Sequence, residues 1–358
     1  MIRPSPLDAV RNILILRTDH LGDLLLSTPL IRTLRTALPG RRFTLVVSPA
    51  NAGALDNWDA IDEILLYDPR WSLAKKWRFA RQLATGCGGR PWDLCLVLSP
   101  RTPSYLLGWL SKATLRAGIV YSRRLLARLM SPFWLTHPVV MAVDEQLADH
   151  QPVLHEVRQL AAIAVALGLP ANEPGPLEIP LAATDIAWSE SWLADHEGPT
   201  LGVHGAGKWL SQGWTAEDFL QLLQTLAAPQ RRLVVTFGPG DRLLEQAVTE
   251  ALAARPDPRI LLPGPLSIPR WAALFSCCDL VISPDTGSLH LAVAVGRPVV
   301  AMYEAASFLH CSSQWAPWGT SHAMVRRTSP TATIPILLAE ALRLLAAAEP
   351  TDREAESE

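Results

Sequence analysis

Short apolar runs alternate with longer amphipathic segments along most of the chain. In the first part, apolar runs at residues 12–16 and 43–47 flank a segment with helical spacing at 25–38, which ends at Pro39 and Gly40. Strand, helix and strand in this order predict a βαβ unit of a parallel sheet. Further strands are predicted at 63–67 and 94–98, and further helices at 73–83, 105–110 and 155–167.

The same alternation begins again after a proline-rich segment at residues 170–180. Two such halves predict an α/β protein with two Rossmann-like domains and a ligand cleft between them. We place the domains at 1–175 and 176–348, and we expect the acidic, polar tail at 349–358 not to fold alone. In the second half, strands are predicted at 200–204, 232–237, 260–262, 280–283 and 299–302, and helices at 215–226, 241–254, 269–275, 288–295 and 335–348.

Composition narrows the class of protein. A chain of 358 residues exceeds the usual size of one core, and 49% hydrophobic with 18% charged residues is typical of a globular protein. No uninterrupted apolar run is long enough to span a bilayer, and the first residues lack the layout of a secretory signal, so a cytoplasmic location is expected. The five cysteines include no CxxC pair, so no metal site is expected from them.

Positive charge is concentrated in one part of the chain. Residues 70–128 contain twelve Lys or Arg and a single acid, Asp93. Such a surface is either a solvated helix face or a site for an anionic partner or membrane. Nucleic acid is not expected as a partner, because no nucleic-acid reader motif accompanies the charge.

A polar stretch joins a predicted strand to a predicted helix at residues 283–290. Asp285 or Thr286 is placed to cap this helix, Gly287 removes a side chain where a ligand would approach, and His290 lies one turn later on the same face. A helix start leaves backbone N–H groups unpaired and carries a positive partial charge. The stretch therefore predicts a phosphate-binding site.

The loop after the first strand ends in Asp23, a carboxylate placed either for proton abstraction or as a helix N-cap. Two glycine-rich loops, at residues 205–207 and 238–240, also follow strands. Neither completes the GxGxxG fingerprint, which weakens the case for a dehydrogenase, and no P-loop is present.

Four motifs follow one another in a recognisable order over about residues 11–320. They are Arg17-x-Asp19-x-x-Gly22-Asp23, the His204-Gly-Ala-Gly loop with Trp214, Gly238-Pro-Gly-Asp241, and Asp285-Thr-Gly-x-x-His290 with Gly296-x-Pro298. Together they resemble the heptosyltransferases of glycosyltransferase family 9. The resemblance implies the GT-B fold, with two Rossmann-like domains whose parallel sheets face a central cleft. It also implies an inverting, metal-independent transfer of heptose from ADP-heptose, or a related donor, to lipopolysaccharide core or a similar anionic glycolipid.

The resemblance also implies roles for individual residues. Asp23 would be the general base, no cofactor or metal would be needed, and the acceptor would lie at the inner leaflet, with the enzyme peripheral on that membrane face. The N-terminal domain would bind the acceptor and the C-terminal domain the nucleotide sugar. The implied acceptor-binding residues are Arg17, Asp19, Gly22, Arg101 and His155, and the implied donor-binding residues are Gly205, Lys208, Gln212, Asp241 (with Glu245 in reserve), Asp285, Thr286, Gly287 and His290.

The sequence departs from the family pattern at two places. Gln212 stands two residues before Trp214, where the family has a lysine, and the nearest lysine is Lys208. Tyr303 and Glu304 replace a small glycine turn. Two alternatives stay open on this basis: a nucleotide-sugar epimerase of GT-B type, and a non-catalytic nucleotide-sugar-binding relative. His155 also has a plain structural reading, as a packed helical histidine.

Overall fold

The structure is a computed structural model that describes residues 7–122, 124–141, 152–194, 198–211 and 213–348. The chain divides into two compact units, Met1–Pro180 with Ser313–Trp315, and Leu181–Ser312 with Ala316–Glu358. The division thus falls five residues after the predicted boundary. The short return of Ser313–Trp315 to the first unit was not predicted. The expected tail at 349–358 lies outside the described residues.

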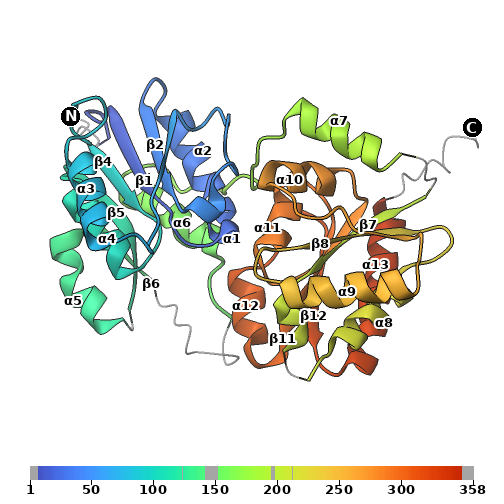
Figure 1. Ribbon diagram of the computed structural model, residues 1–358. Helices are drawn as coiled ribbons and strands as arrows, with labels where there is room; N and C mark the ends of the chain where they lie inside the picture. The colour runs from blue at the N-terminus through green and yellow to red at the C-terminus, as the bar shows by residue number, and fades with distance from the viewer. Residues whose placement is uncertain (1–6, 123, 142–151, 195–197, 212, 349–358) are drawn as a thin grey trace, which may run out of the picture. The chain divides into compact units, whose positions relative to one another are not determined.

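A parallel six-stranded sheet forms the centre of the first unit, in the order β3-β2-β1-β4-β5-β6 (Figure 1). This is the Rossmann strand order, which reverses direction between β1 and β4. The strands are β1 (Asn12–Leu16), β2 (Arg42–Val47), β3 (Glu63–Leu66), β4 (Leu94–Val97), β5 (Leu115–Tyr121) and β6 (His137–Met141).

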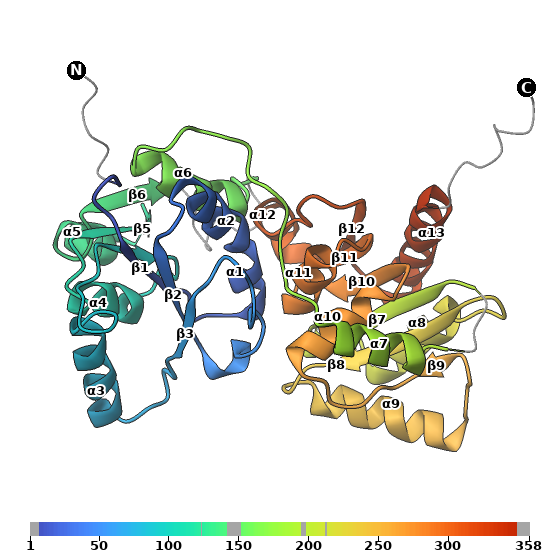
Figure 2. The same cartoon turned by 90° about the horizontal axis from the view of Figure 1, so that it is seen from above.

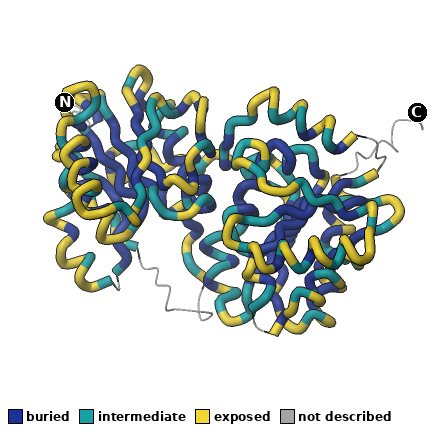
Figure 3. The backbone as a smooth tube through the Cα atoms, in the orientation of Figure 1, coloured by how far each residue is buried: buried dark blue, intermediate teal, exposed yellow. Residues whose placement is uncertain are grey.

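Helices cover both faces of this sheet, as a parallel sheet requires (Figure 2). Helices α1, α2 and α6 lie on one face, and α3, α4 and α5 on the other. The central strands are buried along almost their whole length (Figure 3). The helices are α1 (Leu21–Leu26), α2 (Thr28–Ala37), α3 (Leu73–Ala84), α4 (Thr102–Leu110), α5 (Leu125–Trp134) and α6 (Glu156–Ala166).

The second unit repeats this architecture. Its parallel sheet has the order β12-β11-β10-β7-β8-β9, which is the same Rossmann order with β7 and β10 at the reversal. The strands are β7 (Thr200–Gly205), β8 (Arg232–Phe237), β9 (Ile260–Leu261), β10 (Leu280–Pro284), β11 (Val299–Glu304) and β12 (His322–Arg327). The helices are α7 (Ala183–Trp192), α8 (Ala216–Leu226), α9 (Arg242–Ala254), α10 (Ile268–Ser276), α11 (Gly287–Ala294), α12 (Phe308–Gln314) and α13 (Pro330–Ala348).

The two sheets share one local device. Asp93 precedes β4 and accepts hydrogen bonds from the backbone N–H groups of Arg11 and Asn12, both at 2.8 Å. Asp279 precedes β10 and accepts from the N–H of Thr200 at 2.7 Å. In each unit, a carboxylate therefore fastens the amino end of the neighbouring central strand, where backbone donors would otherwise be unpaired.

The segment predicted as one helix at 25–38 belongs to two helices, because the helical hydrogen bonding is interrupted at Ser27. Pro29 has no N–H, so it cannot donate to the carbonyl of Leu25 in a continuous helix. The hydroxyl of Thr28 bonds that carbonyl instead, at 2.7 Å. As a result α1 starts at Leu21, four residues earlier than predicted, and brings Asp23 into a helix.

Helix α13 is long and apolar enough to cross a membrane by length and composition. The sequence search for an uninterrupted apolar run missed it, because Glu340 and Arg343 interrupt its apolar positions. Its buried residues Ile334, Leu337, Ala341 and Leu344 belong to the hydrophobic core of the second unit. We therefore assign it as a core helix of that unit.

Candidate functional site

Polar side chains gather in each unit where the strand order reverses. In the first unit, β1 leads into residues 17–23 and β4 leads into Leu98 and Ser99. In the second unit, β7 leads into the glycine loop before Lys208, and β10 into Asp285. The carboxyl ends of such strands splay apart at the reversal, which is where α/β proteins bind ligands.

Arg17 is the centre of the cluster in the first unit. Its side chain is 1% exposed, and all three guanidinium nitrogens have partners. Nε donates to the carbonyl of Asp23 at 2.8 Å, Nη1 to the carbonyl of Leu98, and Nη2 to the carboxylate of Glu156. The predicted acceptor contact for Arg17 is therefore replaced by a positioning role, since the guanidinium is fully used inside the protein.

Three carboxylates surround this single buried cation. Oδ1 of Asp19 lies 3.4 Å from Nε of Arg17, and Oδ1 of Asp23 lies 3.7 Å from Nη2. Glu156 is the third. One positive charge thus faces three acids in this buried cluster.

The carboxyl group of Asp23 carries the electrostatic consequence. Burial raises the pKa of Asp23 to about 7, with Glu156 and Asp19 adding to the rise, while Arg17 and the N–H of His20 lower it. That N–H donates to Oδ2 at 3.2 Å, so Asp23 also ties down the start of α1. The side chain keeps 22% of its surface exposed, which leaves it accessible to a substrate. Asp23 is thus a reachable carboxylate with the pKa of a general base.

Glu156 is the residue of this cluster that the sequence did not point to. It is 5% exposed, and besides Arg17 it accepts from the indole N–H of Trp315 at 2.7 Å. It lies 139 residues from Arg17. A glutamate in the first turn of a helix is ordinary in sequence, so only the tertiary fold reveals that it is buried.

The remaining predicted residues of the first unit have different settings. His155 is the N-cap of α6, and its Nδ1 accepts a hydrogen bond from the N–H of Val157 at 3.2 Å. This is a structural role, in capping the helix. Gly22 is buried within α1. Arg101 is exposed at the N-cap of α4, and within the described part of the chain its side chain has no hydrogen bond or ion pair. Arg101 is therefore an exposed cation, among the residues that the structure describes, that is available to an anionic ligand.

In the second unit, the structure brings Lys208 and Asp285 together. Nζ of Lys208 lies 3.1 Å from Oδ2 of Asp285 and also donates to its backbone carbonyl. Burial raises the pKa of Asp285, and the ammonium of Lys208 lowers it. Lys208 keeps 45% of its side chain exposed. A cavity of about 40 Å³ lies beside the pair, lined in part by Glu304, Ser307 and Cys311.

Helix α11 begins at Gly287, one residue before the predicted start. Thr286 is its N-cap, in extended backbone, and its hydroxyl contacts Ser288 Oγ at 2.7 Å. Gly287 is the first helical residue, and His290 is buried one turn later. The helix thus starts close to the ammonium of Lys208. Its first backbone N–H groups and this ammonium together favour an anion.

Asp241 fastens two loops to each other. Oδ1 accepts from the N–H of Gly207 at 2.7 Å, and Oδ2 from the N–H of Gly238 at 3.0 Å. The neighbouring His204 is neutral, because burial lowers its pKa to about 3. Asp241 therefore shapes the loop that carries Lys208, whatever else it binds.

Gly205 has a packing reason that the sequence did not show. A Cβ on this residue would lie 2.3 Å from Cε1 of Phe237, on the adjacent strand. The ring of Phe237, rather than a ligand, thus explains the glycine.

Arg327 and Glu304 form a pair that the sequence analysis did not assign to the site, and it supports the Lys208 loop. Arg327 is fully buried at the end of β12, and it donates to the carbonyl of Lys208, to Ser211 and to Glu304, the last at 3.2 Å. Glu304 was noted as a departure from a glycine turn, and here it extends β11 and partners Arg327. Gln212, which stands where the family has a lysine, lies outside the described residues.

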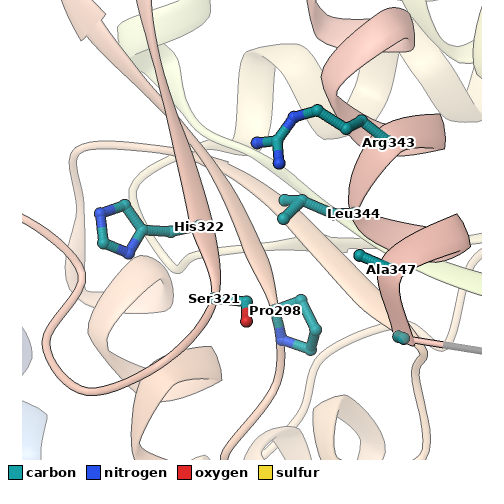
Figure 4. A pocket seen from close by; sticks show the side chains of 7 residues that line it. Pro298, Ser321, His322, Arg343, Leu344 and Ala347 are labelled. Atoms are coloured by element: carbon teal, nitrogen blue, oxygen red, sulfur yellow. The ribbon is translucent and has the colours of Figure 1, made fainter. Parts of the chain in front are cut away.

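A larger pocket of about 270 Å³ lies elsewhere in the second unit (Figure 4). Pro298, Ser321 and His322 line it from the amino ends of β11 and β12, with Arg343 and Leu344 from α13. The site residues lie at the opposite, carboxyl ends of the strands, so this pocket is not part of the site. Among the residues that the structure describes, no group of three or more His, Cys, Asp or Glu is placed to hold a metal ion.

Comparison with known proteins decides the family. The model of glycosyltransferase family 9 (heptosyltransferase) matches residues 77–334. This chain belongs to glycosyltransferase family 9. It is accordingly an enzyme that transfers a glycosyl group, and the predicted fold class of two parallel Rossmann-like sheets is confirmed.

Individual relatives are distant in sequence but similar along their length. The chain is 21% identical over 299 residues to the lipopolysaccharide core heptosyltransferase OpsX of Haemophilus influenzae, covering 83% of this chain and 80% of that protein. A family 9 glycosyltransferase from Veillonella parvula has a TM-score of 0.76 at 19% identity, covering 96% of this chain and 99% of its own. The heptosyltransferase WaaC of E. coli, solved with ADP, has a TM-score of 0.66 at 18% identity, covering 94% and 99%. At these identities the structures show a shared fold.

Proposed function

We propose that this family 9 enzyme transfers a heptose, or a related sugar, from an ADP-activated donor to lipopolysaccharide core or a similar anionic glycolipid. The family match supports transfer of a glycosyl group. The relative in Haemophilus influenzae is named for lipopolysaccharide core, and the E. coli structure contains ADP, which together support the acceptor and the nucleotide.

One observation carries the mechanism: an accessible carboxylate, Asp23, with a pKa raised to about 7 among buried acids. In the proposed step, Asp23 takes the proton of an acceptor hydroxyl while that oxygen attacks the anomeric carbon of the donor. The bond from this carbon to the diphosphate breaks, and its electron pair leaves with the nucleotide. A single displacement inverts the anomeric centre and needs no covalent enzyme intermediate.

The donor is assigned to the second unit. Negative charge grows on the diphosphate as it leaves, and the ammonium of Lys208 with the first N–H groups of α11 would stabilise it without a metal. In this proposal Lys208 supplies the charge that the family places at position 212. Thr286 and His290 would add hydrogen bonds, and Asp241 or Glu245 would meet the ribose.

The acceptor is assigned to the first unit. Arg101 would meet an acceptor phosphate, while Arg17, Asp19 and Gly22 shape the start of α1 that holds Asp23. We place the enzyme in the cytoplasm, peripheral on the inner face of the membrane that carries a lipid-linked acceptor.

Incubation of the purified enzyme with ADP-heptose and a core lipid acceptor tests the proposal by mass spectrometry. We expect ADP and an acceptor heavier by one heptose, with the opposite anomeric configuration to the donor. A changed donor in the absence of acceptor would instead show an epimerase. Donor binding without turnover, across several nucleotide sugars and acceptors, would show a non-catalytic relative.

A further inference from the structure

Helix α5 presents an apolar stripe outward, away from the core of its own unit. Leu125, Leu126, Leu129 and Phe133 are 74%, 79%, 71% and 66% exposed. Their spacing places all four within an arc of about 100° on the helix surface. Figure 3 draws α5 largely in the exposed colour. An amphipathic helix normally turns such a stripe toward the core, so this one is reversed.

The opposite side of α5 already fastens the helix to the unit. The ring of Trp134 stacks on Tyr105 with centroids 5.5 Å apart, and Nε of Arg116 donates to the carbonyl of Trp134 at 2.7 Å. Ser131 and Leu135 are buried on this side. The outward leucines are therefore not needed to hold the helix in place, and a contiguous apolar stripe of this kind marks an interaction surface.

The neighbouring helices extend this surface. Helix α4 contacts both α3 and α5. Trp77 on α3 is 60% exposed and Trp109 on α4 is 49% exposed. Tryptophan is enriched at the boundary between lipid headgroups and acyl chains, because its ring is apolar and its N–H is polar. We call the outward surface of α3, α4 and α5 the α3–α5 face.

Charge on the α3–α5 face has one sign. Its exposed cations include Lys75, Arg78, Arg81, Lys112 and Arg128. From residue 69 to residue 141 the sequence has one acid, Asp93, whose carboxylate is held by the backbone of Arg11 and Asn12. Asp68 pairs with Arg70 and interacts with Lys75 at one edge of the face. The face therefore combines apolar side chains with a local excess of positive charge.

We propose that the α3–α5 face docks on an anionic lipid surface, with the α5 leucines and Phe133 entering the headgroup boundary and the cations meeting lipid phosphates. Amphipathic helices with cationic flanks bind membrane surfaces in this way. A second copy of the chain is the poorer occupant, because a symmetric dimer through this face would bring like charges together. The inference rests on the proposed function only in that a lipid-linked acceptor gives the docking its purpose.

Sedimentation with vesicles tests the docking directly. The full chain is mixed with one of two kinds of vesicle. One is phosphatidylcholine with about one-third phosphatidylglycerol, an anionic lipid, and the other is phosphatidylcholine alone. We expect binding to the anionic vesicles that weakens with added salt. Leu126→Gln with Leu129→Gln should weaken it about tenfold or more, and Arg128→Gln about fivefold. The control pair Leu243→Gln and Leu342→Gln alters exposed leucines of the second unit and should leave binding unchanged.

Three further readings separate the possible outcomes. Equal sedimentation of the wild-type protein and the Leu126/Leu129 variant would overturn the docking, and so would absence of any vesicle binding. A wild-type dimer that the same variant converts to a monomer would show that a second copy covers the face. Transfer to a delipidated, soluble acceptor is measured in parallel and should be unchanged in the Leu126/Leu129 variant. A wild-type protein that binds vesicles but shows no transfer would contradict the proposed function and leave the docking intact.

Discussion

The raised pKa of Asp23 predicts that this carboxylate weakens the fold as pH rises. The carboxyl group has an ordinary pKa of 3.8 and a pKa of about 7 in the folded protein. Between these values the folded protein holds a proton that the unfolded chain has released, so the free energy of unfolding falls with rising pH. Above about pH 7 both states have lost the proton, and the effect levels off.

Asp23→Asn mimics the protonated carboxyl and removes this dependence. Linkage with the two pKa values gives a difference in unfolding free energy, variant minus wild type, that grows by roughly 3 kcal/mol between pH 5 and pH 8, with the variant the more stable. The magnitude is a ceiling, because residual exposure of the side chain softens the cost of charging it. Burial is the main cause, so the sign does not depend on Arg17, which opposes it.

Urea unfolding at pH 5, 6, 7 and 8 on both proteins measures this difference. Asp59→Asn is the matched control, since Asp59 is a 77% exposed partner of Arg32 and should show no such growth with pH. A difference between Asp23→Asn and wild type that stays flat from pH 5 to pH 8, or that grows with the wild type the more stable, would refute the electrostatic reasoning.

Three further changes probe the two clusters. Glu156→Gln removes a neighbour that raises the pKa of Asp23, so the rising limb of the pH–rate profile should move to lower pH; a limb that stays in place would show that Glu156 does not act on Asp23. Lys208→Met should weaken ADP binding in calorimetry by about tenfold, while Arg343→Met on α13 should not; equal affinity in the Lys208 variant would remove the ammonium from the diphosphate site. Gly205→Ala should cost about 1–3 kcal/mol of stability, because its Cβ would meet the ring of Phe237, and Phe237→Leu should recover part of it; a fully stable single variant would show that the ring moves freely.

Sequence pattern predicted the elements that are buried on both faces. The strand at Asn12–Leu16 was placed at its observed bounds, because a continuous apolar run between polar turns has few other solutions. The strand at His322–Arg327 was missed, since alternate residues are buried and it follows an irregular segment. Helix α5 was also missed. Its apolar residues face outward, so its sequence lacks an apolar stripe that packs on the core.

The site was predicted in part, for physical reasons that differ by residue. Asp23 follows a strand of the first sheet, and Lys208 and the start of α11 follow strands of the second; within each sheet, parallel strands bring their carboxyl ends to one edge. Glu156 and Arg327 reach the site from distant elements, and a buried charge in sequence looks like a surface one. Arg17 was assigned to the acceptor through the family resemblance, whereas here its side chain is enclosed by its own unit.

In the proposed step Asp23 removes the proton from the acceptor, and the turnover of Asp23→Asn measures that role. The variant keeps the shape of the side chain and is compared with wild type at saturating ADP-heptose and core acceptor across pH 5 to 9, with the vesicle binding and ADP affinity of both proteins measured alongside. We expect a kcat reduced by about 10² to 10⁴-fold with ADP affinity intact, and a wild-type rate that rises with pH through about 7. A variant that turns over within a few-fold of wild type, with the same pH profile, would contradict it.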